Sequence, residues 1–277
     1  MTKFPYNRII SYGCSFTSGE ELADGLYLNM SDAELSEYIN ANKIKNSNEL
    51  FYNFLKLDRN TVEKIRKHGK TLSWPNFIAK HFNVPLLNRA CAGASNEQML
   101  YYYMKDKYEG EIKSTDLVLF GLTSPARWHQ FTNQGDEIFG VAAHPWSGVD
   151  PEFQKSFIDN WFNSYNMSFN YAKTITFISN QSDLNDNNIK LCYAFITPKT
   201  YKYSVLDQLS DKRANDFFEM TMNMYPKHNF LFDDICLYDL TSDPKIEGKK
   251  FHAFGHPKIQ FHEQFANILI EKIEASI

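Results

Sequence analysis

Short apolar runs alternate along this chain with stretches whose apolar residues recur at helical spacing. Strands are predicted over residues 8–12, 83–90, 116–120, 190–196 and 235–240. Helices are predicted over residues 74–81, 97–108, 153–178, 211–222 and 263–277, and a loop-rich stretch over 128–150. Strands that alternate with helices are typical of a mostly parallel sheet covered on both faces. We therefore expect an α/β fold, a three-layer α/β/α sandwich.

Residues 23–70 break this alternation, because no period-two apolar run occurs in them. Ser31 followed by Glu34 has the pattern of a capping box, which predicts a helix through Ile39. Two further apolar clusters, 50–57 and 61–68, are also compatible with helices. We expect a peripheral helical insertion or lid directly after the first strand, within a single domain of residues 1–277.

Composition and charge narrow the class of protein. The chain has 277 residues, with 29 basic and 33 acidic side chains and a net charge of −4, so no basic footprint for nucleic acid stands out. No apolar run approaches the roughly 18 residues of a membrane span. The first residues also lack the apolar segment of a secretory signal. These features predict a cytoplasmic protein that binds neither nucleic acid nor membrane.

Neither cysteines nor histidines form a pattern typical of a metal site. The four cysteines are far apart, with no Cys-x-x-Cys pair: Cys14, Cys91, Cys192 and Cys236. His252, His256 and His262 are closer together, but Gly255 and Pro257 flank the middle one and disfavour a helical arrangement of ligands. We expect no metal, no disulfide framework and no cofactor.

Three predicted strands end in loops of small residues. The loops are Gly13-Cys14-Ser15, Ala92-Gly93-Ala94 and Gly121-Leu122-Thr123. Right-handed connections bring such loops to one edge of a parallel sheet, where ligands usually bind. A late loop before the last helix contributes His256. A serine, loops rich in backbone N–H groups and a late histidine are the parts of an acyl-transfer site.

These blocks resemble those of the SGNH (GDSL-type) hydrolases. Gly13-Cys14-Ser15 resembles their Gly-Asp-Ser block, and Ser15-Phe16-Thr17 matches its phage and bacterial variants. Gly93 matches the glycine of the second block. Gly121-Leu122-Thr123 falls on the third block, and Ala253-Phe254-Gly255-His256-Pro257 on the last. The four blocks occur in family order across nearly the whole chain.

The resemblance implies an SGNH- or flavodoxin-like fold and a serine esterase. It implies Ser15 as the nucleophile and His256 as its base. The backbone N–H groups of Ser15 and Gly93, with Thr123, would face the developing oxyanion. Family substrates are esters of sugars, lipids and small acyl donors, so an O-acyl ester of a carbohydrate is the substrate that we expect.

Three substitutions separate this chain from the family pattern. Cys14 replaces the Asp of Gly-Asp-Ser, Thr123 replaces the Asn of the third block, and Ala253 replaces the Asp before the histidine. Losing the acid of a triad costs on the order of 10⁴ in rate, and losing one oxyanion donor roughly 10² to 10³. His256 therefore needs another acceptor, for which a backbone carbonyl, Asp239 and Asp243 are candidates.

Two alternatives stay open at this point. Cys14 is an alternative nucleophile with His256 as its base. The chain is alternatively a non-catalytic SGNH-like module that binds a glycan or forms part of a larger assembly such as a virion, because fold does not determine function. As a hydrolase, the chain would bind a small-molecule or glycan ester as its substrate. As a non-catalytic module, it would instead be part of an oligomer or of a larger assembly.

Overall fold

The computed structural model describes residues 4–124, 127–131, 138–142, 152, 169–170, 172–178, 190–195, 216, 220, 223, 236–241, 250–253 and 255–276. Four parallel strands form its main sheet, in the order β2-β1-β3-β6. They are β1 (Arg8–Gly13), β2 (Leu86–Asn88), β3 (Asp116–Leu122) and β6 (Lys190–Phe195). The predicted parallel sheet is thus confirmed, with β2 shorter than the apolar run suggested.

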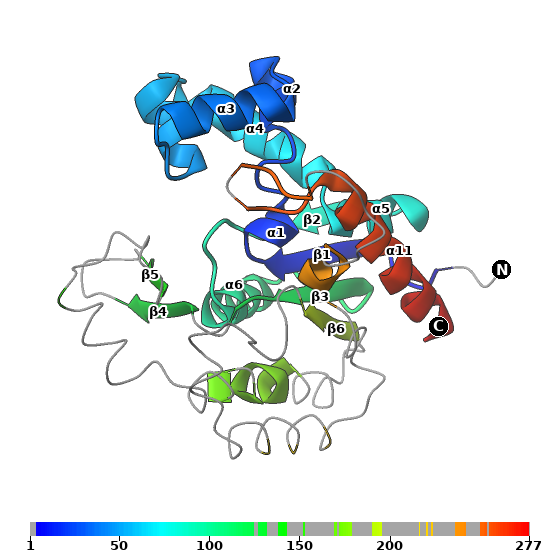
Figure 1. The fold of residues 1–277 in the computed structure, drawn as a ribbon. Coiled ribbons are helices and arrows are strands. Elements are labelled where there is room, and N and C mark those ends of the chain that lie inside the picture. Colours follow the sequence, from blue (N-terminus) through cyan, green and yellow to red (C-terminus); the bar gives the residue numbers. More distant parts are fainter. Residues whose placement is uncertain are drawn as a thin grey trace.

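Helices cover both faces of this sheet (Figure 1). On one face Ile9 and Leu117 pack in a buried cluster with α5 (Trp74–His81) and α11 (Ile259–Ala275). On the other face Ile10 and Val118 pack with α6 (Asn96–Tyr108) and with the helical residues 172–178. Strands buried on both faces read as continuous apolar runs, which is why β1 and β3 were recognisable. The fold is the expected three-layer α/β/α sandwich.

The segment after β1 is helical, as its pattern predicted. It contains α1 (Ser15–Ser18), α2 (Asp24–Leu28), α3 (Asp32–Ala41), the π-helical turn η1 (Glu49–Phe54) and α4 (Arg59–Thr71). The capping box at the start of α3 is present, since Ser31 N–H donates to Glu34 Oε2 at 2.7 Å and Glu34 N–H donates to Ser31 Oγ at 3.3 Å. In Figure 1, α2, α3 and α4 lie together at the top of the view, above α1 and the sheet.

The insertion has a hydrophobic cluster of its own and also packs closely against the turn after α1. Leu35, Phe51 and Val62 belong to a buried cluster that joins α3, η1 and α4. At Gly69, α4 meets the turn after α1 backbone to backbone. A Cβ atom on Gly69 would lie 2.4 Å from the Gly19 carbonyl oxygen. Helix α4 is therefore packed directly against the turn that follows the first block.

Two local predictions were wrong. Within the stretch expected to be loop, β4 (Arg127–Phe131) and β5 (Ile138–Ala142) form an antiparallel pair. The expected strand at 235–240 is instead the short helix α10 (Leu237–Leu240), because Cys236 and Asp239 form a reciprocal cap at its N-terminus. Of the helix expected at 211–222, only residues 216 and 220 are described, and both are helical. Most of 153–171 lies outside the described residues.

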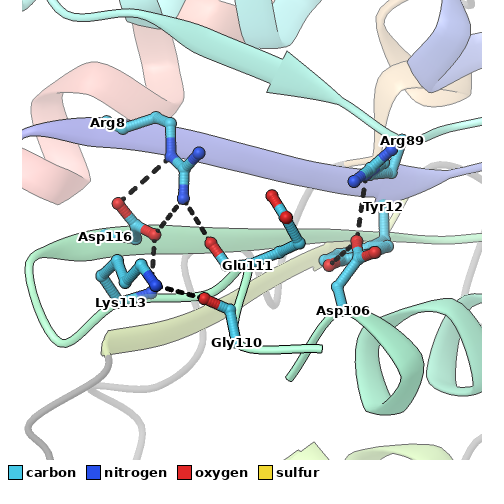
Figure 2. A network of polar contacts seen from close by, with 8 residues as sticks. All are labelled: Arg8, Tyr12, Arg89, Asp106, Gly110, Glu111, Lys113 and Asp116. Atoms are coloured by element: carbon cyan, nitrogen blue, oxygen red, sulfur yellow. Dashed lines mark hydrogen bonds and ion pairs between the residues drawn. The ribbon is translucent and has the colours of Figure 1, made fainter. Parts of the chain in front are cut away.

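Charged contacts join the amino-terminal ends of β1 and β3 (Figure 2). At the start of β1, Arg8 Nη2 lies 2.6 Å from Asp116 Oδ2 on β3 and donates to the Glu111 carbonyl at 2.6 Å. Asp116 is nearly fully buried and also accepts from the Lys113 backbone N–H at 2.8 Å. Several donors thus satisfy the oxygens of this buried side chain. This network aligns the start of β1 with the start of β3.

A second network lies toward the carboxyl end of β1 (Figure 2). The Tyr12 hydroxyl donates to Asp106 Oδ2 of α6 at 2.7 Å, and Arg89 Nε donates to the same oxygen at 3.0 Å. Burial raises the pKa of Tyr12 strongly, so its hydroxyl stays protonated and remains a donor. These hydrogen bonds fix the end of β1 against α6, three residues before Ser15.

No helix within the described ranges is both long and apolar enough to cross a membrane. The single domain of residues 1–277 and the cytoplasmic location stay predictions.

Candidate active site

Ser15 lies where β1 ends and α1 begins. Gly13 permits the tight turn there, since a Cβ atom on it would lie 2.2 Å from Thr17 Oγ1. Cys14 caps α1 with an extended backbone, and its side chain is fully buried in the apolar cluster beneath the sheet. Ser15 is 5 % exposed. The burial of Cys14 makes it a packing residue, so the structure disfavours it as the nucleophile.

The predicted small-residue loops lie at one edge of the sheet. Gly13 and Gly121 are paired in the parallel register of β1 and β3. The Cys91 N–H donates to the Gly13 carbonyl at 3.1 Å, which places the loop after β2 beside the same strand end. Gly93 in that loop is exposed and has φ +79°, with open space where a side chain would be. Its left-handed conformation suits glycine.

Thr123 is held by a residue that sequence reasoning did not single out. Asn96 Oδ1 accepts from the Thr123 N–H at 3.0 Å, and Asn96 Nδ2 donates to the Thr123 carbonyl at 3.1 Å. Both residues are fully buried. The Thr123 hydroxyl is enclosed, without a hydrogen-bond partner among the described residues. Its proposed role at the oxyanion stays a prediction; the only sequence signal for Asn96 was its place after the N-cap Ser95.

A tight turn presents His256. The His252 N–H donates to the His256 carbonyl at 2.8 Å, and Phe251 bridges to Pro257 across the loop. The imidazole of His256 lies beside the ring of Phe16, with centroids 5.1 Å apart. Because Phe16 directly follows Ser15, the first and last blocks meet here. No hydrogen bond joins Ser15 and His256, both of which are described; such bonds are often absent without substrate.

Glu21 lies where His256 needs an acceptor in place of the Asp that Ala253 replaces. Its Oε2 lies 2.5 Å from His256 Nδ1 and also accepts from the His256 backbone N–H at 3.2 Å. The Glu21 side chain is 2 % exposed, against 16 % for His256. A carboxylate on Nδ1 selects the tautomer whose Nε2 accepts a proton.

Neither aspartate proposed from the sequence takes this role. Asp239 accepts from the Cys236 N–H and caps α10, and Asp243 lies outside the described residues. Glu21 comes instead from the first block, six positions after Ser15. Its backbone has φ 66°, a left-handed conformation that is uncommon and strained for a residue other than glycine. Strain of this kind is concentrated at functional sites.

The histidine loop is also tied to the insertion. Asp32, at the start of α3, has Oδ2 2.6 Å from Lys258 Nζ and Oδ1 3.4 Å from His252 Nδ1. Burial lowers the pKa of His252, whose Nε2 has no partner among the described residues. Within the described part of the chain, no group of three or more His, Cys, Asp or Glu side chains could hold a metal ion.

Glu21 lines two cavities. One, of about 480 Å³, lies between residues 18–24, α4 and residues 90–92. The other, of about 440 Å³, lies between Glu21, the turn before α3 and His252. Neither lining includes Ser15 or His256, so both cavities flank the serine-histidine region instead of enclosing it.

Replacing Asp24 by asparagine should change how stability depends on pH. Asp24 is 3 % exposed, and its Oδ2 has no partner among the described residues. Burial, then the nearby Glu21 and Glu20, raise its pKa to about 8. A raised acid pKa means that the folded state holds a proton that the unfolded state releases. The free energy of unfolding therefore falls by about 1.4 kcal/mol per pH unit as the pH rises from the usual aspartate pKa toward 8.

Asp24→Asn cannot ionise, so it does not lose this stability. The melting temperature of the variant relative to that of the wild type should therefore increase from about pH 5 to pH 8. Thermal unfolding across this range measures the difference. Glu37→Gln, an exposed substitution on α3, is the control and should follow the wild-type curve. Parallel curves for Asp24→Asn and the wild type would contradict the buried, protonated carboxyl.

No protein-family model and no curated protein sequence matches this chain significantly. Among solved structures, a member of the lipolytic protein G-D-S-L family from Veillonella parvula is 13% identical with a TM-score of 0.47, covering 95% of this chain and 96% of its own.

Two esterase structures show the same degree of similarity. The psychrotrophic esterase EstA from Pseudoalteromonas is 10% identical, with a TM-score of 0.47 and 97% of both chains covered. A carbohydrate esterase, whose active site is described as having divergent catalytic and non-catalytic binding functions, is 11% identical with a TM-score of 0.47, covering 96% of this chain and 68% of its own. The G-D-S-L family is the one that the sequence blocks resemble, while the assignment of reactive residues depends on the geometry described above.

Proposed function

We propose that this chain is a serine ester hydrolase with Ser15 as nucleophile, His256 as base and Glu21 as the residue that positions the base. The observation that carries the proposal is the 2.5 Å contact between Glu21 and His256 Nδ1. It supplies the acceptor that Ala253 cannot provide, beside the strand end that bears Ser15. A nucleophile, a base and an orienting acid are the elements of a hydrolytic triad.

The chemistry follows the general course of acyl transfer. Ser15 Oγ attacks the ester carbonyl while its proton passes to His256 Nε2, and Glu21 stabilises the imidazolium. The backbone N–H groups of Ser15 and Gly93, with the Thr123 hydroxyl, receive the negative charge on the carbonyl oxygen. His256 then protonates the departing alcohol, and water hydrolyses the acyl-serine with the same base. The Ser15–His256 hydrogen bond forms as substrate binds.

An O-acyl ester of a carbohydrate is the substrate that we propose. The larger cavity beside the site supports a polar substrate, since nine of its fifteen lining residues are charged or polar, including Glu20, Asp24, Asn48 and Arg66. A long acyl chain would need an apolar pocket. Short acyl groups on a polyhydroxylated alcohol suit this lining better.

A fluorophosphonate probe tests the nucleophile directly. We expect one label, located on Ser15 by peptide mass spectrometry, in the wild-type protein. The label should disappear in Ser15→Ala and in His256→Ala, because the hydroxyl needs its base to react. His81→Ala is the matched control, since His81 is exposed and pairs with Glu274 far from the first block; it should label as the wild type does.

A non-catalytic, glycan-binding module is the second candidate. The observation in its favour is that Ser15 is nearly buried, while the Thr123 hydroxyl is enclosed. A folded wild-type protein that neither labels nor cleaves short acyl esters, yet binds an oligosaccharide, would support it over the hydrolase.

A further inference from the structure

The larger cavity has a basic wall. Arg66 and Lys70 both line it and lie four residues apart on α4, hence on one face of that helix. Lys67 also contributes to the lining. The opposite walls are the turn of residues 18–24 and the loop of residues 90–92. The cavity thus joins the insertion to the segment that precedes Gly93.

Neither Arg66 nor Lys70 forms an ion pair with a described carboxylate. Arg66 Nη2 donates to Asn48 Oδ1 at 2.5 Å, while its Nε is buried without a partner among the described residues. Lys70 Nζ donates to the Asn88 carbonyl at 2.9 Å, and burial lowers its pKa. Partly buried cations that no carboxylate contacts directly are unfavourable. An anionic ligand would offset that cost.

The acidic residues of the lining do not cancel this charge. Asp24, with its pKa of about 8, is mostly protonated at neutral pH. Glu63 pairs with a side chain one turn earlier on its own helix. Glu20 and Glu21, the latter directed toward His256, remain as two acidic side chains against three basic ones.

The cavity is also placed beside the proposed reaction centre. Glu21 lines it and positions His256. Ala92, on the opposite wall, directly precedes Gly93, whose N–H we assign to the oxyanion. A group bound here belongs to the part of the substrate that does not react, where binding energy aids positioning.

We propose that this cavity binds a carboxylate or phosphate group through Arg66 and Lys70, so that the preferred carbohydrate esters are acidic. That the bound molecule is a substrate depends on the proposed function, whereas the binding of an anion in this cavity does not. Arginine suits planar or tetrahedral oxyanions through its forked donors, and lysine adds a point charge.

Calorimetric titration of the full-length Ser15→Ala protein tests the site without turnover. The probes are D-glucuronate, D-glucose 6-phosphate and D-glucose, which separate carboxylate, phosphate and neutral sugar. At least one acidic sugar should bind about tenfold or more tightly than glucose. Adding Arg66→Gln or Lys70→Gln should remove most of that preference. Lys64→Gln is the matched control on α4, exposed and outside the cavity, and should keep it.

The proposal would be overturned if glucose bound as tightly as the acidic sugars or if neither acidic sugar bound. It would also be overturned if Lys64→Gln lost the preference for acidic sugars as fully as the cavity variants do. If a cavity variant does not fold, salt dependence replaces it. Affinity of Ser15→Ala for the acidic sugar must fall between about 50 and about 500 mM NaCl, and a constant affinity would also refute the site. Acid-selective binding in a protein that the fluorophosphonate does not label would keep this inference and discard the hydrolase. Labelling with charge-blind binding would do the reverse.

Discussion

Glu21→Gln should lower kcat for a short neutral ester such as 4-nitrophenyl acetate by on the order of 10⁴, with KM little changed. The amide has nearly the shape of the carboxylate but no charge, so it cannot stabilise the imidazolium. Its NH₂ group can also face Nδ1 and select the wrong tautomer. Steady-state kinetics on protein shown to be folded by circular dichroism measures both parameters.

The control for this variant is Glu37→Gln, which makes the same chemical change at an exposed site on α3. It should hydrolyse the ester at the wild-type rate. A purely structural role for Glu21 would lower the melting temperature and leave kcat of the folded protein within about tenfold of the wild type. That result would remove Glu21 from the proposed triad.

Gly19→Ala should reduce the free energy of unfolding by about 3 kcal/mol. Gly19 has φ +74°, and a Cβ atom on it would lie 2.3 Å from the Gly69 carbonyl oxygen. The new methyl group therefore meets both an unfavourable backbone conformation and the backbone of α4, which cannot rotate away. Urea unfolding measures the loss.

Gly110→Ala separates these two causes. Gly110 has nearly the same backbone angle, φ +73°, but nothing lies within 4 Å of a Cβ atom placed on it. Its replacement should cost about 1 kcal/mol, the conformational part alone. If Gly19→Ala and Gly110→Ala destabilise the protein equally, the close contact between the first-block turn and α4 is not a source of stability.

Elements with a strong local pattern were predictable from the sequence. The buried strands β1 and β3 are apolar because helices cover the sheet on both faces, β6 was found from its apolar run, and α3 begins at a recognisable capping box. The small-residue turns after β1 and β3 share a sheet edge because parallel strands in register must end together. Ser15 and His256 were nominated from blocks that resemble those of the SGNH hydrolases, and their roles stay proposals.

Contacts between distant segments were decided by the tertiary structure. No local pattern distinguishes Glu21 from the adjacent Glu20; what selects it is a left-handed turn that directs one carboxylate to a histidine 235 positions away. The cap formed by Cys236 and Asp239 likewise overrode an apolar run that read as a strand. Hydrophobic periodicity reports which face of an element is buried. Which polar side chains meet depends on how the loops turn and on what α4 packs against, and these are properties of the folded chain alone.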